Sequence, residues 1–138
     1  MNFARRIVLD TGILVSAAIR PQSIPALTLE KALLQFEVCV CHATLQELET
    51  VLRRSKFDHY LPATQREAFI AGFRDHATLF DVTQAVSDCP DPKDTIFLAL
   101  ADTAMAELII SSDPHLTNLH PWRGIPIMPP SAFLVGIR

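Results

Sequence analysis

Two short runs of the chain are apolar at every position and lead to an aspartate: Ile7-Val8-Leu9, which stops at Asp10, and Leu108-Ile109-Ile110, which is followed by Ser111-Ser112-Asp113. An uninterrupted apolar run of this length is typical of a strand buried on both faces, as in a parallel sheet covered by helices. Ligands bind beyond the carboxyl ends of the strands in such a sheet. We therefore expect Asp10 and Asp113 at the functional edge of a parallel sheet.

The chain between these runs alternates between helical and strand patterns. One helix is marked by apolar residues at Leu45, Leu48, Val51 and Leu52, which follow one face at helical spacing. Strands that alternate with helices of this length imply right-handed crossovers and a parallel sheet with helices on both faces. The expected segments are helices at about 13–19, 25–36, 42–52, 62–78 and 94–106, strands at about 7–9, 38–40, 79–82, 108–110 and 125–128, and a turn at 131–134.

The length of 138 residues fits a single domain, 1–138, that can bury a core without disulfides. The net charge is −3, so a polyanionic ligand must be handled by a local basic patch and a bound metal rather than by a basic surface. The cysteines are odd in number and lack a zinc or redox motif, so we expect buried thiols. The apolar run at 7–9 is too short for a signal peptide or a membrane span, and we expect a cytoplasmic protein with no membrane partner.

Two further acidic residues, Glu47 and Asp94, are expected in the first turns of helices. Such turns begin at the same edge of the sheet as Asp10 and Asp113, so the four carboxylates are expected to share one anionic pocket. An oxygen-only ligand set favours Mg²⁺ or Mn²⁺ over zinc, and such an ion commonly acts on phosphate. We therefore hypothesise a metal-dependent nuclease. An acid in a first turn is also favoured by the helix macrodipole alone, and Asp10 alone also suits a helix N-cap.

Five segments carry a resemblance to a known family: VLDTGILVSA, ATLQELETVL, DPKDTIFLALA, LIISSDPHL and the C-terminal PPSAFL. They resemble the PIN-domain endoribonucleases, in particular their small toxin-like branch, and together they cover nearly the whole chain. The resemblance implies a three-layer α/β/α sandwich with a five-stranded parallel sheet. It also implies that Asp10, Glu47, Asp94 and Asp113 are catalytic acids that hold one or two Mg²⁺ or Mn²⁺ ions. The chain departs from the family at Ser112, where a glycine is common.

The same resemblance implies hydrolysis of RNA phosphodiester bonds by the toxin of a toxin–antitoxin pair, with an antitoxin protein as partner, and it leaves a homodimer open. The alternative from another class is a non-catalytic PIN-like module that binds RNA or a protein partner. The presence of all four acids favours the nuclease. An aspartic protease, which Asp10-Thr11-Gly12 also matches, uses a carboxylate dyad in an all-β fold, so the helical patterns argue against it.

Three further residues are auxiliary candidates for the site. Asp91 lies three residues before Asp94 and is the alternative ligand, but Asp94 is preferred because the apolar helix begins directly after it. Thr11 and Ser111 match positions where the resembling family often has hydroxyls near the site. Each of these two is equally typical of an ordinary turn or strand end.

Three basic residues, Arg53, Arg54 and Lys56, are candidates for contact with RNA phosphates. A solvated basic face is the more common explanation for such a run. The five histidines show no ligand spacing, and His115 is interpreted as a loop residue. Trp122 either stacks on a base or packs the loop before the last strand, and packing is the preferred interpretation.

Overall fold

The structure is a computed structural model that describes residues 5–89 and 91–136. Residues 1–4, at the start of the N-terminal segment weighed as a targeting signal, lie outside the described residues. The same holds for Pro90, just before the helix expected at about 94–106, and for residues 137–138. The expected single domain, 1–138, stays a prediction. No helix in the described part of the chain is long and apolar enough to cross a membrane.

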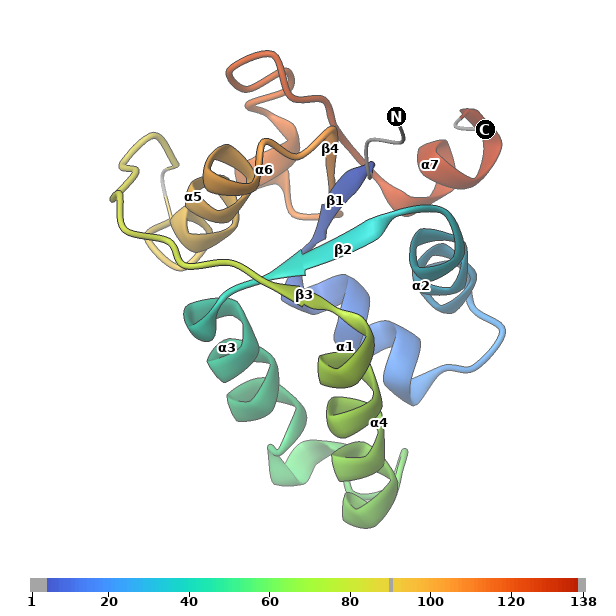
Figure 1. The fold of residues 1–138 in the computed structure, drawn as a ribbon. Helices are drawn as coiled ribbons and strands as arrows, with labels where there is room; N and C mark the ends of the chain where they lie inside the picture. The colour runs from blue at the N-terminus through green and yellow to red at the C-terminus, as the bar shows by residue number, and fades with distance from the viewer. Residues whose placement is uncertain (1–4, 90, 137–138) are drawn as a thin grey trace.

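Five parallel strands form one sheet in the order β3-β2-β1-β4-β5 (Figure 1). In the central strand, Ile7 is in register with Val38 on one side and Leu108 on the other. The strands are β1 (Arg6–Leu9), β2 (Glu37–Val40), β3 (Thr78–Leu79), β4 (Leu108–Ile110) and β5 (Ile127–Met128). The predicted five-stranded parallel sheet is confirmed.

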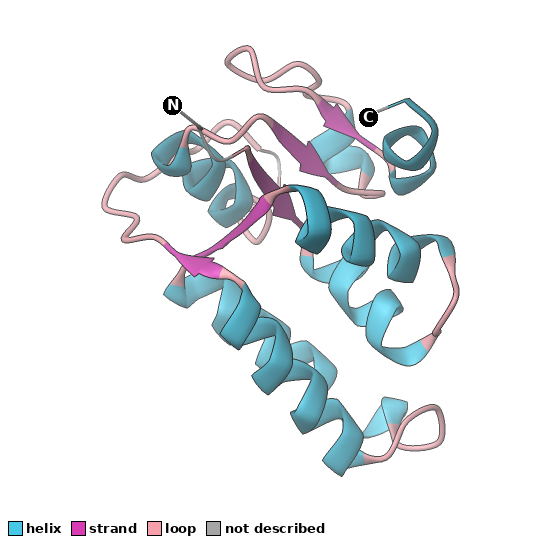
Figure 2. Cartoon of the chain, turned by 45° about the vertical axis from the view of Figure 1, so that its right-hand side comes forward, coloured by secondary structure: helices cyan, strands magenta, loops and turns pink. Residues whose placement is uncertain are grey.

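Helices cover both faces of this sheet and complete the predicted three-layer α/β/α sandwich (Figure 1, Figure 2). The face covered by α1, α2, α3, α4 and α7 packs in one apolar cluster, and α5 and α6 pack on the opposite face in another. The helices are α1 (Thr11–Ile19), α2 (Ile24–Gln35), α3 (His42–Leu52), the 3₁₀ turn η1 (Ser55–Phe57), α4 (Ala63–His76), α5 (Thr95–Ala104), α6 (Pro114–Thr117) and α7 (Pro130–Gly136).

The central strands divide their side chains between the two apolar clusters. Ile7 and Leu9 of β1 point into the cluster of the first face, whereas Val8 points into the cluster beneath α5. Both Ile7 and Val8 are fully buried, as are Ile109 and Ile110 of β4. Burial on both faces is the reason why these strands are apolar at every position.

The order of the strands reverses direction at β1. The chain leaves β1 for β2 and β3 on one side, and α5 then carries it across to β4 and β5 on the other side. The carboxyl ends of β1 and β4 are neighbours, and the amide of Asp10 donates to the carbonyl of Ile110 at 3.1 Å. Their connections lead away in opposite directions, which opens a crevice of the kind where ligands bind in such sheets.

Two predicted segments differ from the structure, and one helix was not predicted. The third strand is Thr78–Leu79 rather than 79–82, because its last ladder bond is donated by the amide of Phe80 to Val40 and the chain then continues as an extended loop. The expected turn at 131–134 is part of the helix α7, whose Phe133 is fully buried. The helix α6, which begins after Asp113, was not predicted.

Candidate metal centre

Asp10 follows the last residue of β1 and is the N-cap of α1. Its Oδ1 accepts from the amide of Ile13 at 2.9 Å, and its Oδ2 accepts from the hydroxyl of Ser111. Only 7% of Asp10 is exposed, and burial raises the pKa of its carboxyl. The negative charges of Asp113 and Glu47 raise that pKa further. A buried carboxylate whose pKa is raised by other carboxylates is a group that gains from a bound cation.

Asp113 reaches the crevice from the end of β4. The hydroxyl of Ser111, which is fully buried, donates to Asp10 and accepts from the amide of Asp113 at 2.9 Å. Asp113 is also the N-cap of α6, since its Oδ1 accepts from the amide of His115 at 2.9 Å. Ser111 therefore links the carboxylate of Asp10 to the backbone amide of Asp113 through one oxygen atom.

Glu47 lies on α3, the helix that follows β2, in the second turn rather than in the first turn that we predicted. Its Oε2 accepts from the hydroxyl of Thr11 at 2.9 Å, and Thr11 itself is buried at the start of α1. The predicted apolar stripe on α3 places Leu45, Leu48 and Leu52 in the core, so Glu47 lies beside the buried face. The hydroxyls of Thr11 and Ser111 thus hold one oxygen of Glu47 and one of Asp10.

Asp94 occupies the N-cap position of α5, but its side chain caps no amide. Its Oδ2 is buried and has no hydrogen-bond partner among the described residues. Burial, followed by the neighbouring carboxylates of Asp113, Asp91 and Asp10, raises the pKa of Asp94 to about 7. A buried oxygen without a donor is costly, and a cation is the ligand that would satisfy it.

The four predicted acids line one cavity of about 540 Å³. Its polar end comprises Asp10, Glu47, Asp94 and Asp113 with Thr11 and Ser112, and its wall includes apolar residues of α1, α3 and η1. Carboxylates from four separate elements supply only oxygen donors, which suit Mg²⁺ or Mn²⁺. The orphaned oxygen of Asp94 fits the same group of ions.

Asp91 and His115 are the other two residues whose positions near this cavity can be compared with the sequence analysis. Asp94 lines this cavity and Asp91 does not, and the preference for Asp94 as the ligand stays a prediction. His115 lies in α6 rather than in a loop, and its Nδ1 is 3.7–3.8 Å from carboxylate oxygens of Asp91, Asp94 and Asp113. Sequence spacing missed His115 because two of these neighbours come from a different part of the chain.

The three basic candidates are not equivalent. Arg53 forms two hydrogen bonds of 2.8 Å to the carboxylate of Glu67, which occupies its guanidinium. The ammonium of Lys56 lies 5.1 Å above the ring centroid of Phe57. Arg54 is exposed and lines a shallow groove that also contains Glu47 and Lys93. Among the three, Arg54 is therefore the side chain placed beside the acidic cavity.

Trp122 packs rather than projecting into solvent. It is 5% exposed, and its indole Nε1 donates to Asp88 at 2.7 Å. This placement agrees with the preferred interpretation of Trp122 as the packing residue of the loop before β5. The three cysteines are free and buried, as expected.

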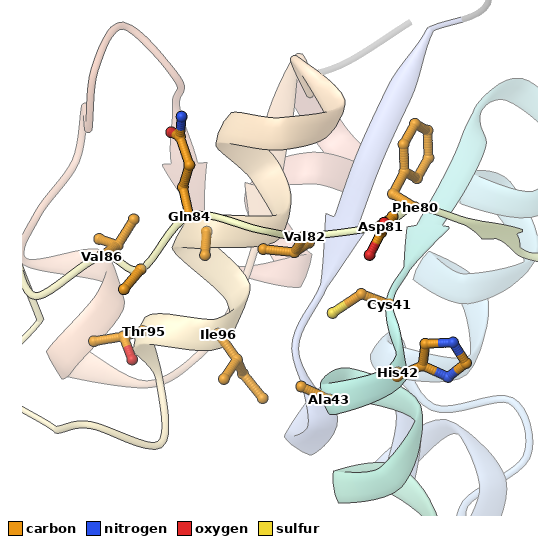
Figure 3. A pocket seen from close by; sticks show the side chains of 12 residues that line it. Cys41, His42, Ala43, Phe80, Asp81, Val82, Gln84, Val86, Thr95 and Ile96 are labelled. Carbon is orange, nitrogen blue, oxygen red and sulfur yellow. The ribbon is translucent and has the colours of Figure 1, made fainter.

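A second cavity of about 390 Å³ lies away from the four carboxylates, none of which lines it. Figure 3 shows the extended segment 80–86 along one side and the first turns of α3 and α5 along the other. Val82, Val86 and Ile96 contribute apolar walls, and Cys41 lies at the start of α3. The polar part of its lining includes His42, Asp81 and Gln84.

A comparison with family models matches residues 6–115 to the PIN domain. Because this match spans most of the chain, the protein belongs to the PIN-domain family. A search of curated proteins finds no match. Among solved structures, the chain is similar to one in the crystal structure of VapBC2 from Rickettsia felis bound to a DNA fragment from their promoter. The TM-score is 0.60 and the sequence identity is 14%, and the match covers 88% of this chain and 96% of that chain. At 14% identity, this similarity supports a shared fold and nothing further.

Proposed function

We propose that this PIN-domain protein is a metal-dependent endoribonuclease that hydrolyses RNA phosphodiester bonds, and that it is the toxin of a toxin–antitoxin pair. One observation carries the proposal: Asp10, Glu47, Asp94 and Asp113 come from four elements and line one cavity at the crevice between β1 and β4. Membership of the PIN-domain family supports a nuclease, and the oxygen-only donor set supports Mg²⁺ or Mn²⁺ as cofactor.

The side chains of the chain have distinct roles in this proposal. Asp10, Glu47, Asp94 and Asp113 would hold one or two ions, which supply a Lewis acid for the phosphate and lower the pKa of water. Ser111 and Thr11 act as positioning residues, because their hydroxyls donate to one oxygen of Asp10 and one oxygen of Glu47.

Basic side chains beside the cavity are suited to hold the RNA backbone. Arg54 and Lys93 line a groove that shares Glu47 with the acidic cavity, and both are exposed. Neither forms an ion pair with a described residue, so both charges are available to phosphate oxygens. Lys93 was not predicted from the sequence. Because the net charge is −3 and the basic contacts are few, RNA binding is expected to weaken only gently with salt.

The toxin assignment rests on the resemblance of the sequence to small toxin-like PIN domains and on the fold shared with a chain of the VapBC2 complex. We propose an antitoxin protein as the partner and the cytoplasm as the location. Three free buried thiols are consistent with a reducing compartment. A homodimer remains part of the proposal as a state to be measured by sedimentation.

The test is a cleavage assay on single-stranded RNA with Mg²⁺ or Mn²⁺, with wild type and Asp10→Asn purified identically and freed of any bound partner. Asparagine retains the N-cap acceptor for Ile13 but removes the charge. We expect the wild type to cut RNA, to spare a DNA of the same sequence, and to lose all activity in EDTA. Asp10→Asn is expected to be inactive.

Equal cleavage by both proteins would identify a contaminating nuclease. Absence of cleavage by the wild type on varied RNAs with both metals would replace the proposal with a non-catalytic module that binds RNA or a partner. A charge-reversal control, Arg54→Glu, should weaken RNA binding without changing metal binding, whereas Arg53→Glu should weaken RNA binding less.

A further inference from the structure

The second cavity, of about 390 Å³, lies at the same edge of the sheet as the four-acid cavity. Two of the residues that line it, Cys41 and Phe80, directly follow the strands β2 and β3, just as Asp10 directly follows β1. The strands are parallel, so all three residues lie beyond carboxyl ends at one edge. Ligands of parallel sheets bind along this edge.

The shallow groove that contains Arg54 and Lys93 joins the two cavities. It shares Ala43 with the second cavity and Glu47 with the four-acid cavity. Ala43 and Glu47 are four residues apart on α3, which is about 6 Å along the helix axis at about 1.5 Å per residue. A single RNA strand with one phosphate over the four acids would therefore bring the neighbouring nucleotide to the second cavity.

The charges along this path are divided between the groove and the second cavity. Arg54 and Lys93 in the groove are exposed cations, which suit phosphate oxygens. The second cavity is lined by one carboxylate, Asp81, and by no lysine or arginine among the described residues. A phosphate is repelled there, so the cavity favours the neutral part of a nucleotide.

The walls of the second cavity suit a flat apolar ring. Figure 3 shows Val82 of the extended segment on one side, Ile96 of α5 and Ala43 of α3 on the other, and the thiol of Cys41 beside them. Unpaired bases are commonly bound between aromatic or apolar side chains. The volume also falls within the range of about 300–1,000 Å³ that is typical of small-ligand cavities.

Asp81 provides a means of reading the edge of a base. Its carboxylate forms no hydrogen bond with a described residue, and it is exposed at the cavity. An ionised carboxylate only accepts hydrogen bonds, so its partner must donate. Adenine, cytosine and guanine carry amino groups that donate, whereas uracil has a carbonyl oxygen in place of the amino group of cytosine. Asp81 therefore favours the amino-bearing bases.

We propose that the second cavity binds one unpaired base of the RNA, on a nucleotide next to the scissile phosphodiester, and that Asp81 favours a base with an amino group. This inference deepens the proposed function and rests on it for the RNA strand. Val82, Ile96 and Asp81 determine sequence preference in this arrangement, while the four acids hold the ions that act on the phosphate.

The test is a methyl NMR titration of the protein in Mg²⁺ with AMP, CMP, GMP and UMP, which contain no phosphodiester bond that the protein could cut. The methyl groups of Val82, Val86 and Ile96 are expected to shift with the three amino-bearing nucleotides and less with UMP. Ribose 5-phosphate, which lacks a base, is the matched control and should leave them in place. Val135, 86% exposed on α7, serves as the internal reference.

Two variants measure the contributions of the wall and of the carboxylate. Val82→Glu places a charge in the apolar wall and should weaken AMP binding about 5–150-fold, the loss that corresponds to one stacked base. Val135→Glu is the matched control and should bind AMP as the wild type does. Asp81→Asn should raise the affinity for UMP close to that for CMP, because an amide can also donate.

Unchanged methyl resonances with all four nucleotides, or equal shifts with ribose 5-phosphate, would overturn the base site and leave the cavity to an apolar side chain of a protein partner. Equal affinities for CMP and UMP in the wild type would overturn the role of Asp81. RNA cleavage by the same preparation separates these results from the proposed function. Cleavage without methyl shifts retains the nuclease and refutes the base site, whereas base-dependent shifts without cleavage do the reverse.

Discussion

At the scale of single residues, the site depends on how a few hydroxyls and carboxylates share hydrogen bonds. Ser111 contacts both Asp10 and the backbone of Asp113, and Thr11 contacts Glu47. From the sequence, Thr11 and Ser111 could equally be ordinary turn residues, because only the fold brings their partners within reach. The positions of Asp10 and Asp113 were predictable, since each follows a run that is apolar on both faces.

Replacement of Ser111 by alanine is expected to loosen the acidic cavity. The substitution leaves Asp10 Oδ2 and the amide of Asp113 without this partner, which should cost about 1–3 kcal/mol in the free energy of unfolding. Mn²⁺ affinity should fall roughly 10–100-fold, as for other residues that orient metal ligands. The matched control is Ser55→Ala, at an exposed serine that does not line this cavity. Urea unfolding and calorimetry would refute this role of Ser111 if the two variants gave the same values.

The raised pKa of Asp94 predicts a pH dependence in the metal-free protein. Burial and the carboxylate of Asp113 raise this pKa from its ordinary 3.8 to about 7. The protonated carboxyl therefore contributes stability that is complete below about pH 4 and is lost as the pH rises through 7. We expect Asp94→Asn to melt roughly 2–8 °C above the wild type at pH 8 in EDTA and at the same temperature at pH 4. A difference that does not change between these pH values would contradict the assignment.

At the scale of elements, one buried arginine holds the end of α3, the helix that carries Glu47. Arg66 of α4 is 2% exposed and donates to the carbonyls of Leu52, Leu61 and Arg54 as well as to the carboxylate of Asp58. These carbonyls lie at the end of α3 and along the turn that follows it. The planar fork of the guanidinium satisfies several acceptors at once, which an ammonium group cannot match.

Arg66→Lys is therefore expected to destabilise the fold by about 2–4 kcal/mol, because buried carbonyls at the end of α3 lose their donors. Arg74→Lys is the matched control, since its exposed pair with Glu49 should contribute less than about 1 kcal/mol. Chemical denaturation of the two variants measures both values. Equal destabilisation would show that Arg66 does not organise this region.

The elements that sequence analysis missed are those whose apolar content is buried by distant parts of the chain. Phe80 and Val82 suggested a longer third strand, but they pack against the apolar cluster beneath α5 instead of continuing the ladder. The helix α7 was read as a turn, although Phe133 packs on Phe36 with ring centroids 5.7 Å apart. The helix α6 had a readable signal, because Asp113-Pro114 combines an N-cap with proline at the first helical position.

At the scale of the whole molecule, strand order brings residues from opposite ends of the chain into one crevice. Asp10 and Asp113 are far apart in sequence but follow adjacent strands. Glu47 in the second turn of α3 and Asp94 at the N-cap of α5 line the same cavity. The alternating pattern and the family resemblance together predicted this convergence. The placement of His115 against Asp91 and Asp94 was out of reach, because neither spacing nor resemblance connects α6 to the segment before α5.

The most direct test of the central claim, that four converging carboxylates form a cation site, is thermal unfolding at pH 7.5 in EDTA and in Mn²⁺, for wild type and Asp10→Asn. Four acids in one cavity repel one another until a cation binds, and a ligand that binds only the folded protein raises its stability with concentration. At about 100 times the dissociation constant this gain is about 2.7 kcal/mol, or roughly 7–12 °C for a chain of this length. We expect that rise for the wild type and a much smaller one for Asp10→Asn. Identical melting temperatures of the wild type in EDTA and in saturating Mn²⁺ would contradict the account.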